Sequence, residues 1–302
     1  MFDSPDESVA VPGGAPPRRG CGASTGLVVL DTDTFYDPDD TVTLAIARTQ
    51  PNLVVITSDE TRGRRARMVR RILDLMDRPE VPVFAGVDLG GEHRFLLDDH
   101  LEGTAPQSDD LTVLAEICSA TDGPIRWVGM GPMSNIARLL SSAPELTERI
   151  VLTQMGGWLD RYRDKTRASH NFHTDPVAAG LALRVAYQPR LVLSDFTNVS
   201  QIEVTADWAF IRHLRAPGAP AWARLVAANF DAWFTRRPSS RMHDPLTFAA
   251  ALDMPFITFK NETVRIEQDA RLFRDPAGRP VSVPDTVDYD SFLEWMHEGV
   301  RW

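Results

Sequence analysis

The sequence predicts one α/β domain with a mainly parallel central sheet flanked by helices. Short apolar runs rich in Val, Ile and Leu alternate along the chain with segments of helical periodicity. The connections are short, and this alternation is typical of a parallel sheet built from strand–helix–strand units. The runs that we interpret as strands are 28–30, 53–57, 81–86, 125–130, 150–152, 191–193 and the beginning of 281–302.

Composition bounds the size and the class of the protein. With 302 residues, 43% of them hydrophobic and 25% charged, the chain is long enough to bury a substantial core. Residues 1–26 are instead rich in Pro, Gly and Ser and contain no hydrophobic run, which predicts a disordered N-terminal tail. We therefore expect the folded domain to span residues 27–302.

The net charge and the cysteines disfavour several classes of function. A formal net charge of −10 argues against nucleic-acid binding, which depends on neutralising phosphates. No run approaches the roughly 18 apolar residues that a membrane helix needs. The two cysteines, Cys21 and Cys118, form no metal or redox motif. We therefore expect a cytoplasmic protein that binds neither nucleic acid nor a membrane.

An acidic cluster follows the first predicted strand. Its five carboxylates, within ten residues, belong to Asp31, Asp33, Asp37, Asp39 and Asp40. A helical segment comes directly after them, so the cluster lies on a strand-to-helix loop, where parallel sheets form ligand sites. Carboxylates this close repel one another unless a cation lies among them, and Ca²⁺ accepts mixed oxygen ligands readily. Alternatively, Asp39 and Asp40 only favour the positive end of the helix, which leaves the other three unexplained.

This acidic pattern resembles the N-terminal signature of the inosine-uridine preferring nucleoside hydrolases. The signature residues are Asp31-Thr32-Asp33 and Asp37-x-Asp39-Asp40, in the version of the motif with a longer loop. Three later segments resemble family motifs in the same order: Gly131-Pro132-Met133-Ser134-Asn135, Asn171 with Asp175-Pro176, and His243-Asp244-Pro245. The resemblance implies a nucleoside hydrolase-like fold and hydrolysis of the N-glycosidic bond of a nucleoside or a nucleoside derivative.

The resemblance also implies a Ca²⁺ site and two catalytic groups. The metal ligands would be the carboxylates of Asp33, Asp40 and Asp244 and the backbone carbonyl of Met130. Asp33 would act as general base on a water molecule, and His243 would protonate the departing base. By its residues alone, the His243-Asp244-Pro245 segment is also compatible with Asp244 capping a helix that has Pro at its first position.

Other positions would bind the substrate. The resemblance implies that Asp39 holds the ribose 2′-hydroxyl and that Asn171 and Asp244 lie near the 3′-hydroxyl. Phe230 and Trp233 fall on a predicted helix and could stack on the base, although packing in the core explains them equally well. The partner is thus a small nucleoside-like molecule, and relatives of this kind are usually homodimers or homotetramers.

The chain departs from the family pattern at three of its expected sites. Asp59 stands where the family has an Asn that helps bind the ribose. Ser169 replaces a Glu near the 5′ side of the sugar, and Phe35 replaces a Gly. The loop 160–167, just before Ser169, carries four cations. Such a run is usually a solvated face, but it also favours a 5′-phosphorylated or otherwise acidic substrate.

Two further hypotheses remain open at the level of the sequence. The changed sugar contacts are compatible with a weakly active or binding paralogue on the same scaffold. The run Asp31-Thr32-Asp33-Thr34 also fits the nucleophile motif of a haloacid-dehalogenase-like phosphatase, in which Asp31 would attack phosphate. That class needs a downstream Lys, and neither Lys165 nor Lys260 follows a convincing strand-to-helix turn.

Overall fold

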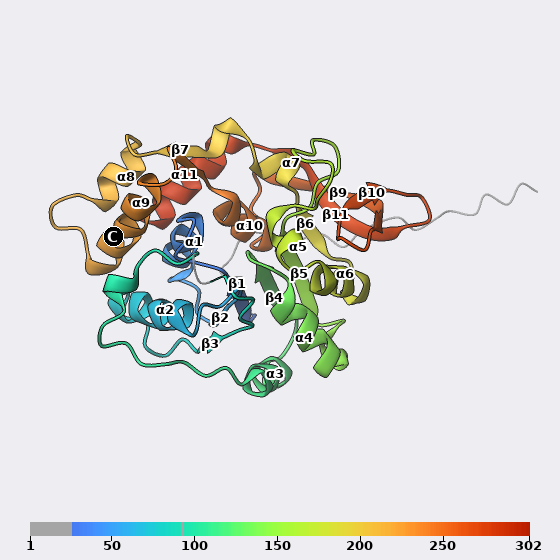
Figure 1. The fold of residues 1–302 in the computed structure, drawn as a ribbon, viewed down its shortest axis with the longest axis horizontal. Helices are drawn as coiled ribbons and strands as arrows, with labels where there is room; N and C mark the ends of the chain where they lie inside the picture. Colours follow the sequence, from blue (N-terminus) through green and yellow to red (C-terminus); the bar gives the residue numbers. More distant parts are fainter. Residues whose placement is uncertain (1–25, 92–93) are drawn as a thin grey trace, which may run out of the picture.

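A nine-stranded sheet forms the centre of the computed structural model, which describes residues 26–91 and 94–302 (Figure 1). The strand order is β10-β9-β11-β6-β5-β4-β1-β2-β3, and every pairing from β11 to β3 is parallel. The predicted single α/β domain with a mainly parallel sheet is therefore confirmed. The predicted tail, except for its last residue, lies outside the described residues.

The elements have the following bounds. The strands are β1 (Val28–Thr32), β2 (Leu53–Thr57), β3 (Val83–Ala85), β4 (Ile125–Gly129), β5 (Ile150–Met155), β6 (Arg190–Val192), β7 (Glu203–Thr205), β8 (Ser239–Arg241), β9 (Ile257–Ile266), β10 (Leu272–Arg274) and β11 (Arg279–Val287). The helices are α1 (Asp39–Ala47), α2 (Arg64–Leu75), α3 (Leu111–Ala120), α4 (Ser134–Ser142), α5 (His170–Thr174), α6 (Pro176–Val185), α7 (Ser194–Thr197), α8 (Ala209–Leu214), α9 (Ala221–Phe234), α10 (His243–Ala251) and α11 (Tyr289–Gly299).

The central parallel strands are mostly apolar because helices cover both faces of the sheet. In β1, Val28 and Leu30 pack into one hydrophobic cluster and Val29 packs into the other. The first cluster contains side chains of α1, α2, α9, α10 and α11, and the second contains side chains of α3, α4 and α6. The domain thus has three layers, which is why the strands appear in the sequence as continuous apolar runs.

An antiparallel extension at one edge of the sheet is absent from the sequence prediction. β9 pairs antiparallel with β11, and β10 pairs antiparallel with β9. β9 carries Lys260, Glu262 and Arg265 among its apolar residues, and most of its side chains are exposed or half-buried. A strand at an edge needs little apolar surface, so the hydrophobic pattern that marks the central strands is missing here.

The topology brings distant parts of the chain to one edge of the sheet. β1, β4 and β5 are parallel neighbours, so the loops that follow them meet at their carboxyl ends. Contacts between α1 and α10 bring the beginning of α10 to the same place (Figure 1). None of the described helices combines the length and the apolar character needed to cross a bilayer.

Candidate active site

The loop between β1 and α1 turns back through a residue in the left-handed region. Phe35 has a φ of 69°, a conformation that favours Gly, which is the residue that the resembling family has at this position. Its ring is fully buried and lies edge-on to Phe95, with 6.2 Å between the ring centroids. Burial of this large side chain offsets the backbone strain, so the loop keeps the left-handed turn without a Gly.

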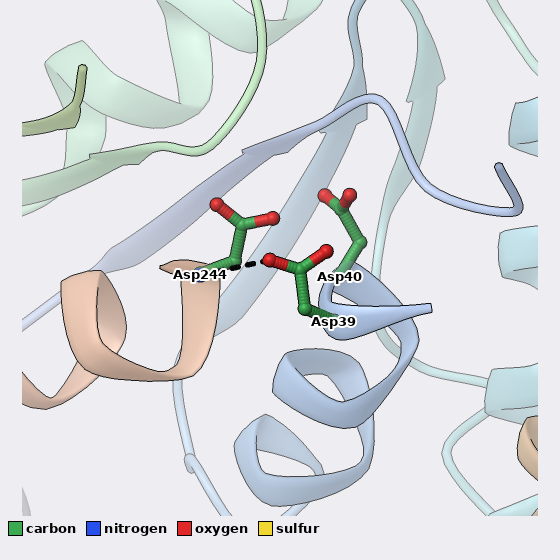
Figure 2. A group of neighbouring side chains, drawn as sticks. All are labelled: Asp39, Asp40 and Asp244. Atoms are coloured by element: carbon green, nitrogen blue, oxygen red, sulfur yellow. Dashed lines mark hydrogen bonds between the residues drawn. The ribbon is translucent and has the colours of Figure 1, made fainter. Parts of the chain in front are cut away.

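Three carboxylates from opposite ends of the chain gather at this edge. Asp39 and Asp40 open α1, Asp244 lies in the first turn of α10, and each contributes an oxygen within 4.8 Å of the others (Figure 2). All three residues are buried. The backbone N–H of Asp244 donates to Asp39 Oδ2 at 3.2 Å. Helix α10 has no side-chain cap, so the capping interpretation of Asp244 is wrong.

The electrostatics of this group favour a divalent cation. Burial, and then repulsion within the acidic cluster, raises the pKa of Asp39, Asp40 and Asp244 well above the usual range. No Lys or Arg of the described residues forms an ion pair with any of the three. A hard, oxygen-only donor set with uncompensated negative charge is the type of site that binds Ca²⁺ or Mg²⁺. The residues present therefore fit a metal ion.

Asp33 and the Met130 carbonyl lie near this group but are not part of it. Asp33 lines the same cavity, and its negative charge raises the pKa of Asp40 and Asp244. Asn171 Nδ2 donates to the Met130 carbonyl oxygen at 2.6 Å. The structure thus brings Asp33, Met130 and Asn171 to one cavity with the three clustered carboxylates.

The other two aspartates of the loop have different surroundings. Asp31 is fully buried and accepts a hydrogen bond from Asn135 Nδ2 at 2.8 Å, and burial raises its pKa to about 7. Asp37 accepts from the Ser240 hydroxyl, and burial raises its pKa to about 7 as well. Asp37 lines the cavity, whereas Asp31 does not. Asp31 therefore stabilises the loop through its hydrogen bond with Asn135 and does not contact the cavity.

The cavity has a volume of about 660 Å³, which is enough for a nucleoside-sized ligand. Its lining comes from the loops after β1, β4 and β5 and from the facing ends of α9 and α10. The lining residues are Asp33, Tyr36, Asp37, Asp39, Asp40, Arg94, Met130, Met155, Trp158, Arg163, Asp164, Arg167, Ala168, Ser169, His170, Asn171, Ser194, Asn198, Trp233, Arg237, His243 and Asp244.

One of the two predicted base-stacking residues reaches the cavity. Trp233 lines it, donates from Nε1 to the Ser239 carbonyl at 2.8 Å and stands edge-on to Tyr36 at 5.3 Å between centroids. Phe230 is fully buried, packs edge-on against Phe210 and is not a lining residue. The expectation that Phe230 stacks on a base is not met, because its position on α9 turns the ring into the core.

His243, which the resemblance implies to protonate the leaving base, lines the cavity beside Asp244. Burial, with the nearby positive charge of Arg241, lowers the pKa of His243 to about 3. Its Nδ1 has no hydrogen-bond partner within the described residues. This low pKa favours the neutral imidazole at neutral pH.

Asp59 does not line the cavity, although the family pattern puts a sugar-binding residue at its position. Its carboxylate pairs with Arg94 at 3.1 Å and lies 4.0 Å from the guanidinium of Arg65. Arg65 is fully buried and also donates to the carbonyl oxygens of Asp33 and Thr34. Arg94 is the member of this group that reaches the cavity.

Sequence reasoning missed several lining residues. His170 directly precedes the predicted sugar-binding Asn171, and that position was a usable signal. Tyr36 lies within the acidic motif itself, and its aromatic ring stands beside that of Trp233. Arg94 comes from a long irregular segment, where no pattern in the sequence indicates which side chain turns inward.

Comparisons with known proteins agree with the sequence motifs. The family model for the inosine-uridine preferring nucleoside hydrolase matches residues 28–294. A pyrimidine-specific ribonucleoside hydrolase of Salmonella arizonae is 28% identical over 313 residues, which cover 91% of this chain and 98% of that protein. Its counterpart in Salmonella schwarzengrund is 26% identical over 269 residues and covers 81% of this chain and 85% of its own.

Solved structures share the fold at lower sequence identity. A plant nucleoside hydrolase superposes with a TM-score of 0.75 at 18% identity, covering 92% of this chain and 99% of the plant chain. An inosine-uridine preferring nucleoside hydrolase from Bacillus anthracis gives a TM-score of 0.74 at 18% identity, covering 91% and 99% of the two chains. With the family model spanning nearly the whole domain, the chain belongs to the inosine-uridine preferring nucleoside hydrolases, a family of N-glycosyl hydrolases.

Proposed function

We propose that the protein hydrolyses the N-glycosidic bond of a ribonucleoside in a Ca²⁺-dependent reaction that releases free base and sugar. The observation that carries this proposal is the group of buried carboxylates formed by Asp39, Asp40 and Asp244 (Figure 2). Buried carboxylates from the first and last quarters of the chain that form no ion pair with a cationic side chain are the arrangement expected of a cation site.

The cation would be held by Asp33, Asp40, Asp244 and the Met130 carbonyl, and Asp39 is close enough to take part. When bound, it would lower the pKa of a coordinated water molecule and orient the ribose hydroxyls. Ca²⁺ suits this set because it accepts carboxylate and carbonyl oxygens in flexible geometry. Asn171 supports this arrangement, since its Nδ2 already fixes the orientation of the Met130 carbonyl.

Side chains of the protein would accept the proton of the water, hold the sugar and contact the base. Asp33 would take the proton of the attacking water, and burial, which raises the pKa of Asp33, makes this carboxylate a better base. Asp39, Asn171 and Asp244 would hold the 2′- and 3′-hydroxyls. Trp233 would flank the base, and a ring N–H of His243 would donate a hydrogen bond to it as the C1′–N bond breaks.

A panel of ribonucleosides, assayed for release of free base, tests this function. The protein is first stripped of metal with a chelator and then assayed with and without added Ca²⁺. We expect release only with Ca²⁺, or much faster release with it. Release that is equal in chelator and in Ca²⁺ would contradict the metal requirement. No release from any nucleoside or nucleotide, with Ca²⁺ bound, would favour the binding paralogue.

The phosphatase hypothesis has no support in this arrangement. Its nucleophile would be Asp31, which is 1% exposed, bonded to Asn135 and outside the cavity. A substrate phosphorus could not approach a carboxylate in this position. Asp31→Asn should therefore leave a residual base-releasing activity that an obligatory nucleophile would not.

We also propose a cytoplasmic location and assembly into a homodimer or homotetramer. Cys118 is buried as a free thiol, which suits a reducing compartment. Light scattering of the purified protein, coupled to size-exclusion chromatography, measures the oligomeric state directly. A monomer at micromolar concentration would contradict the proposed assembly.

A further inference from the structure

The two sides of the cavity carry opposite charge. Six aspartates and four arginines are among the described residues that line it. Five of the six aspartates come from the β1–α1 loop, from α1 and from α10, around the candidate metal site. The arginines are Arg94, Arg163, Arg167 and Arg237. A neutral nucleoside needs a few hydrogen bonds from this region, and it does not need several guanidinium groups.

Arg94 is a cation that a buried anion holds in place. Its guanidinium bonds to Asp59 Oδ2 at 3.1 Å, and the Asp59 side chain is only 1% exposed. Arg94 lines the cavity together with Asp33 and His170. The Asp59–Arg94 pair thus presents a positioned donor to the cavity, at the point where the family pattern has a neutral Asn.

Arg163 and Arg167 lie on the segment between β5 and α5. The first part of this segment is held in place by hydrogen bonds to α7. The carboxylate of Asp195, in α7, accepts from the backbone N–H groups of Leu159, Asp160 and Arg161 at 2.9, 2.8 and 2.6 Å. The anchor fixes the backbone just before Arg163. The arginines therefore project from a segment that is tied down at one end.

The charges of these two arginines are poorly neutralised. Arg167 lies 3.8 Å from Asp164, which also accepts from the backbone N–H of Thr166 at 2.8 Å. Within the described residues, Arg163 pairs with no carboxylate. Ser169 lies on the same segment, at the position where the family pattern has a Glu. Its hydroxyl accepts a hydrogen bond from the Gly157 N–H at 2.7 Å. The cavity-lining part of this segment, 163–171, is the arginine wall. It carries two arginines and one carboxylate, that of Asp164, which already accepts from Thr166 and lies near Arg167.

The position of this wall indicates which part of a substrate it meets. Trp233 and Tyr36 stand on one side of the cavity and suit a flat base, while Asn171 marks the sugar side next to the metal site. Arg163 and Arg167 precede Asn171 in the chain and line the same cavity. A ribose held by its 2′- and 3′-hydroxyls would direct its C5′ substituent toward this stretch.

We propose that Arg94, Arg163 and Arg167 form an anion subsite for a phosphate on C5′, so that the preferred substrate is a nucleoside 5′-monophosphate. The inference rests on the proposed N-glycosidic hydrolysis and narrows its substrate. In the reaction, water adds to C1′, the C1′–N bond breaks, and the base leaves with one proton. The products are free base and ribose 5-phosphate, and no further reactant is needed.

The first test compares kcat/KM for a ribonucleoside and its 5′-monophosphate with the same base, in Ca²⁺. Arg–phosphate hydrogen bonds predict a preference for the monophosphate of about 10- to 100-fold. The double variant Arg163→Ala/Arg167→Ala should lower this preference by about tenfold or more. The matched control Arg161→Ala, on the same loop but outside the cavity lining, should keep the preference. Equal or better turnover of the plain nucleoside would overturn the inference while leaving the proposed function intact.

A binding test is independent of turnover. Calorimetry in Ca²⁺ compares ribose 5-phosphate with ribose, and we expect the phosphate to bind about tenfold tighter or better. If no base is released from any substrate, the proposed hydrolysis fails, but this binding preference still decides the subsite. Equal binding of the two sugars, or a preference that the double variant retains, would overturn it.

A third arm distinguishes a phosphate on the sugar from an acidic group on the base. A nucleoside with a carboxylated pyrimidine is assayed beside the 5′-monophosphate of the neutral pyrimidine. Arg237, at the end of α9 and near Trp233, is the lining cation on the base side. Preference for the carboxylated base, lost in Arg237→Ala and retained in the double variant, would overturn the assignment to C5′.

Discussion

The two sides of the cavity differ in how firmly the fold holds them. The carboxylates of Asp39, Asp40 and Asp244 are buried at the start of two helices that pack on each other. The Arg167 side chain is 59% exposed and lies on a loop. Buried groups between packed helices are hard to move or exchange, whereas exposed loop residues change at little cost in stability. In the proposed scheme, the acidic side carries the chemistry and the arginine side sets the substrate.

The largest effect should come from removing a carboxylate of the acidic side. Asp40→Ala and Asp244→Ala should each lower the rate of base release by about 10³-fold or more, since a lost metal site removes several kcal/mol of transition-state stabilisation. The same holds for Asp33→Ala, which also removes the proposed base. Base release in Ca²⁺ measures the loss.

The metal-free stability of these variants separates a functional role from a structural one. The carboxylates repel one another, so removing one should leave the free energy of unfolding without metal unchanged or higher. Asp285→Ala, an exposed aspartate that pairs with Lys260 on the surface, serves as the control and should keep full activity. Full activity of Asp40→Ala or Asp244→Ala would break the distinction between the two sides.

The next largest effect concerns the support behind the acidic loop. Arg65→Met removes the donors to the carbonyls of Asp33 and Thr34 and leaves the buried Asp59 with Arg94 alone. We expect the free energy of unfolding to fall by about 3–5 kcal/mol, the cost of breaking a buried ion pair. Urea unfolding measures it. Arg71→Met on the same helix loses one exposed bond, to the Glu102 carbonyl, and should cost less than about 1 kcal/mol. Equal stability of the two variants would show that the acidic loop does not depend on this buried cation.

Calcium and pH should act together on the acidic side. Because the folded-state pKa values of this cluster are raised, to about 7 for Asp31 and Asp37, the folded protein binds more protons than the unfolded chain. Without metal, the contribution of this cluster to stability is therefore greatest below the unfolded pKa of about 4 and falls as pH rises toward about 7. Ca²⁺ at about 100 times its Kd should restore about 2.7 kcal/mol, and more at high than at low pH.

Scanning calorimetry across this pH range, with CaCl₂ or with KCl of equal ionic strength, measures the effect as a shift in Tm. The KCl series separates specific binding from screening of the surface charges. A metal-free Tm that rises steadily between about pH 5 and pH 7 would show that the cluster is not destabilised by its own charge.

The smallest effect should come from the anchor beneath the arginine side. Asp195→Ala frees the three N–H groups that fix the loop before Arg163, so the arginines lose some of their preorganisation. We expect KM for a nucleoside 5′-monophosphate to rise about 3- to 10-fold with little change in kcat, which steady-state kinetics can separate. Asp195→Asn keeps one acceptor oxygen and should lie between. A fall in kcat with constant KM would show that the two sides are not independent.

Most of the fold could be predicted from the sequence because the central strands are buried on both faces. Such strands need unbroken apolar runs, and each predicted run corresponds to a strand of the parallel sheet. Strand β9, next to the edge of the sheet, is mostly exposed or half-buried, so it lacks the pattern. The acidic motif and His243-Asp244 were equally visible, since a cluster of carboxylates has few structural uses.

The sequence by itself determined the α/β architecture, the acidic loop and the family, because local pattern and residue chemistry are sufficient for these. Only the tertiary structure decided which side chains share the cavity. It turned Phe230 into the core and Trp233 toward the cavity, although both lie on one helix. It paired Asp59 with Arg94 and so replaced an expected sugar contact by a cation. Such choices depend on contacts between residues far apart in the chain, and no spacing within one segment encodes them.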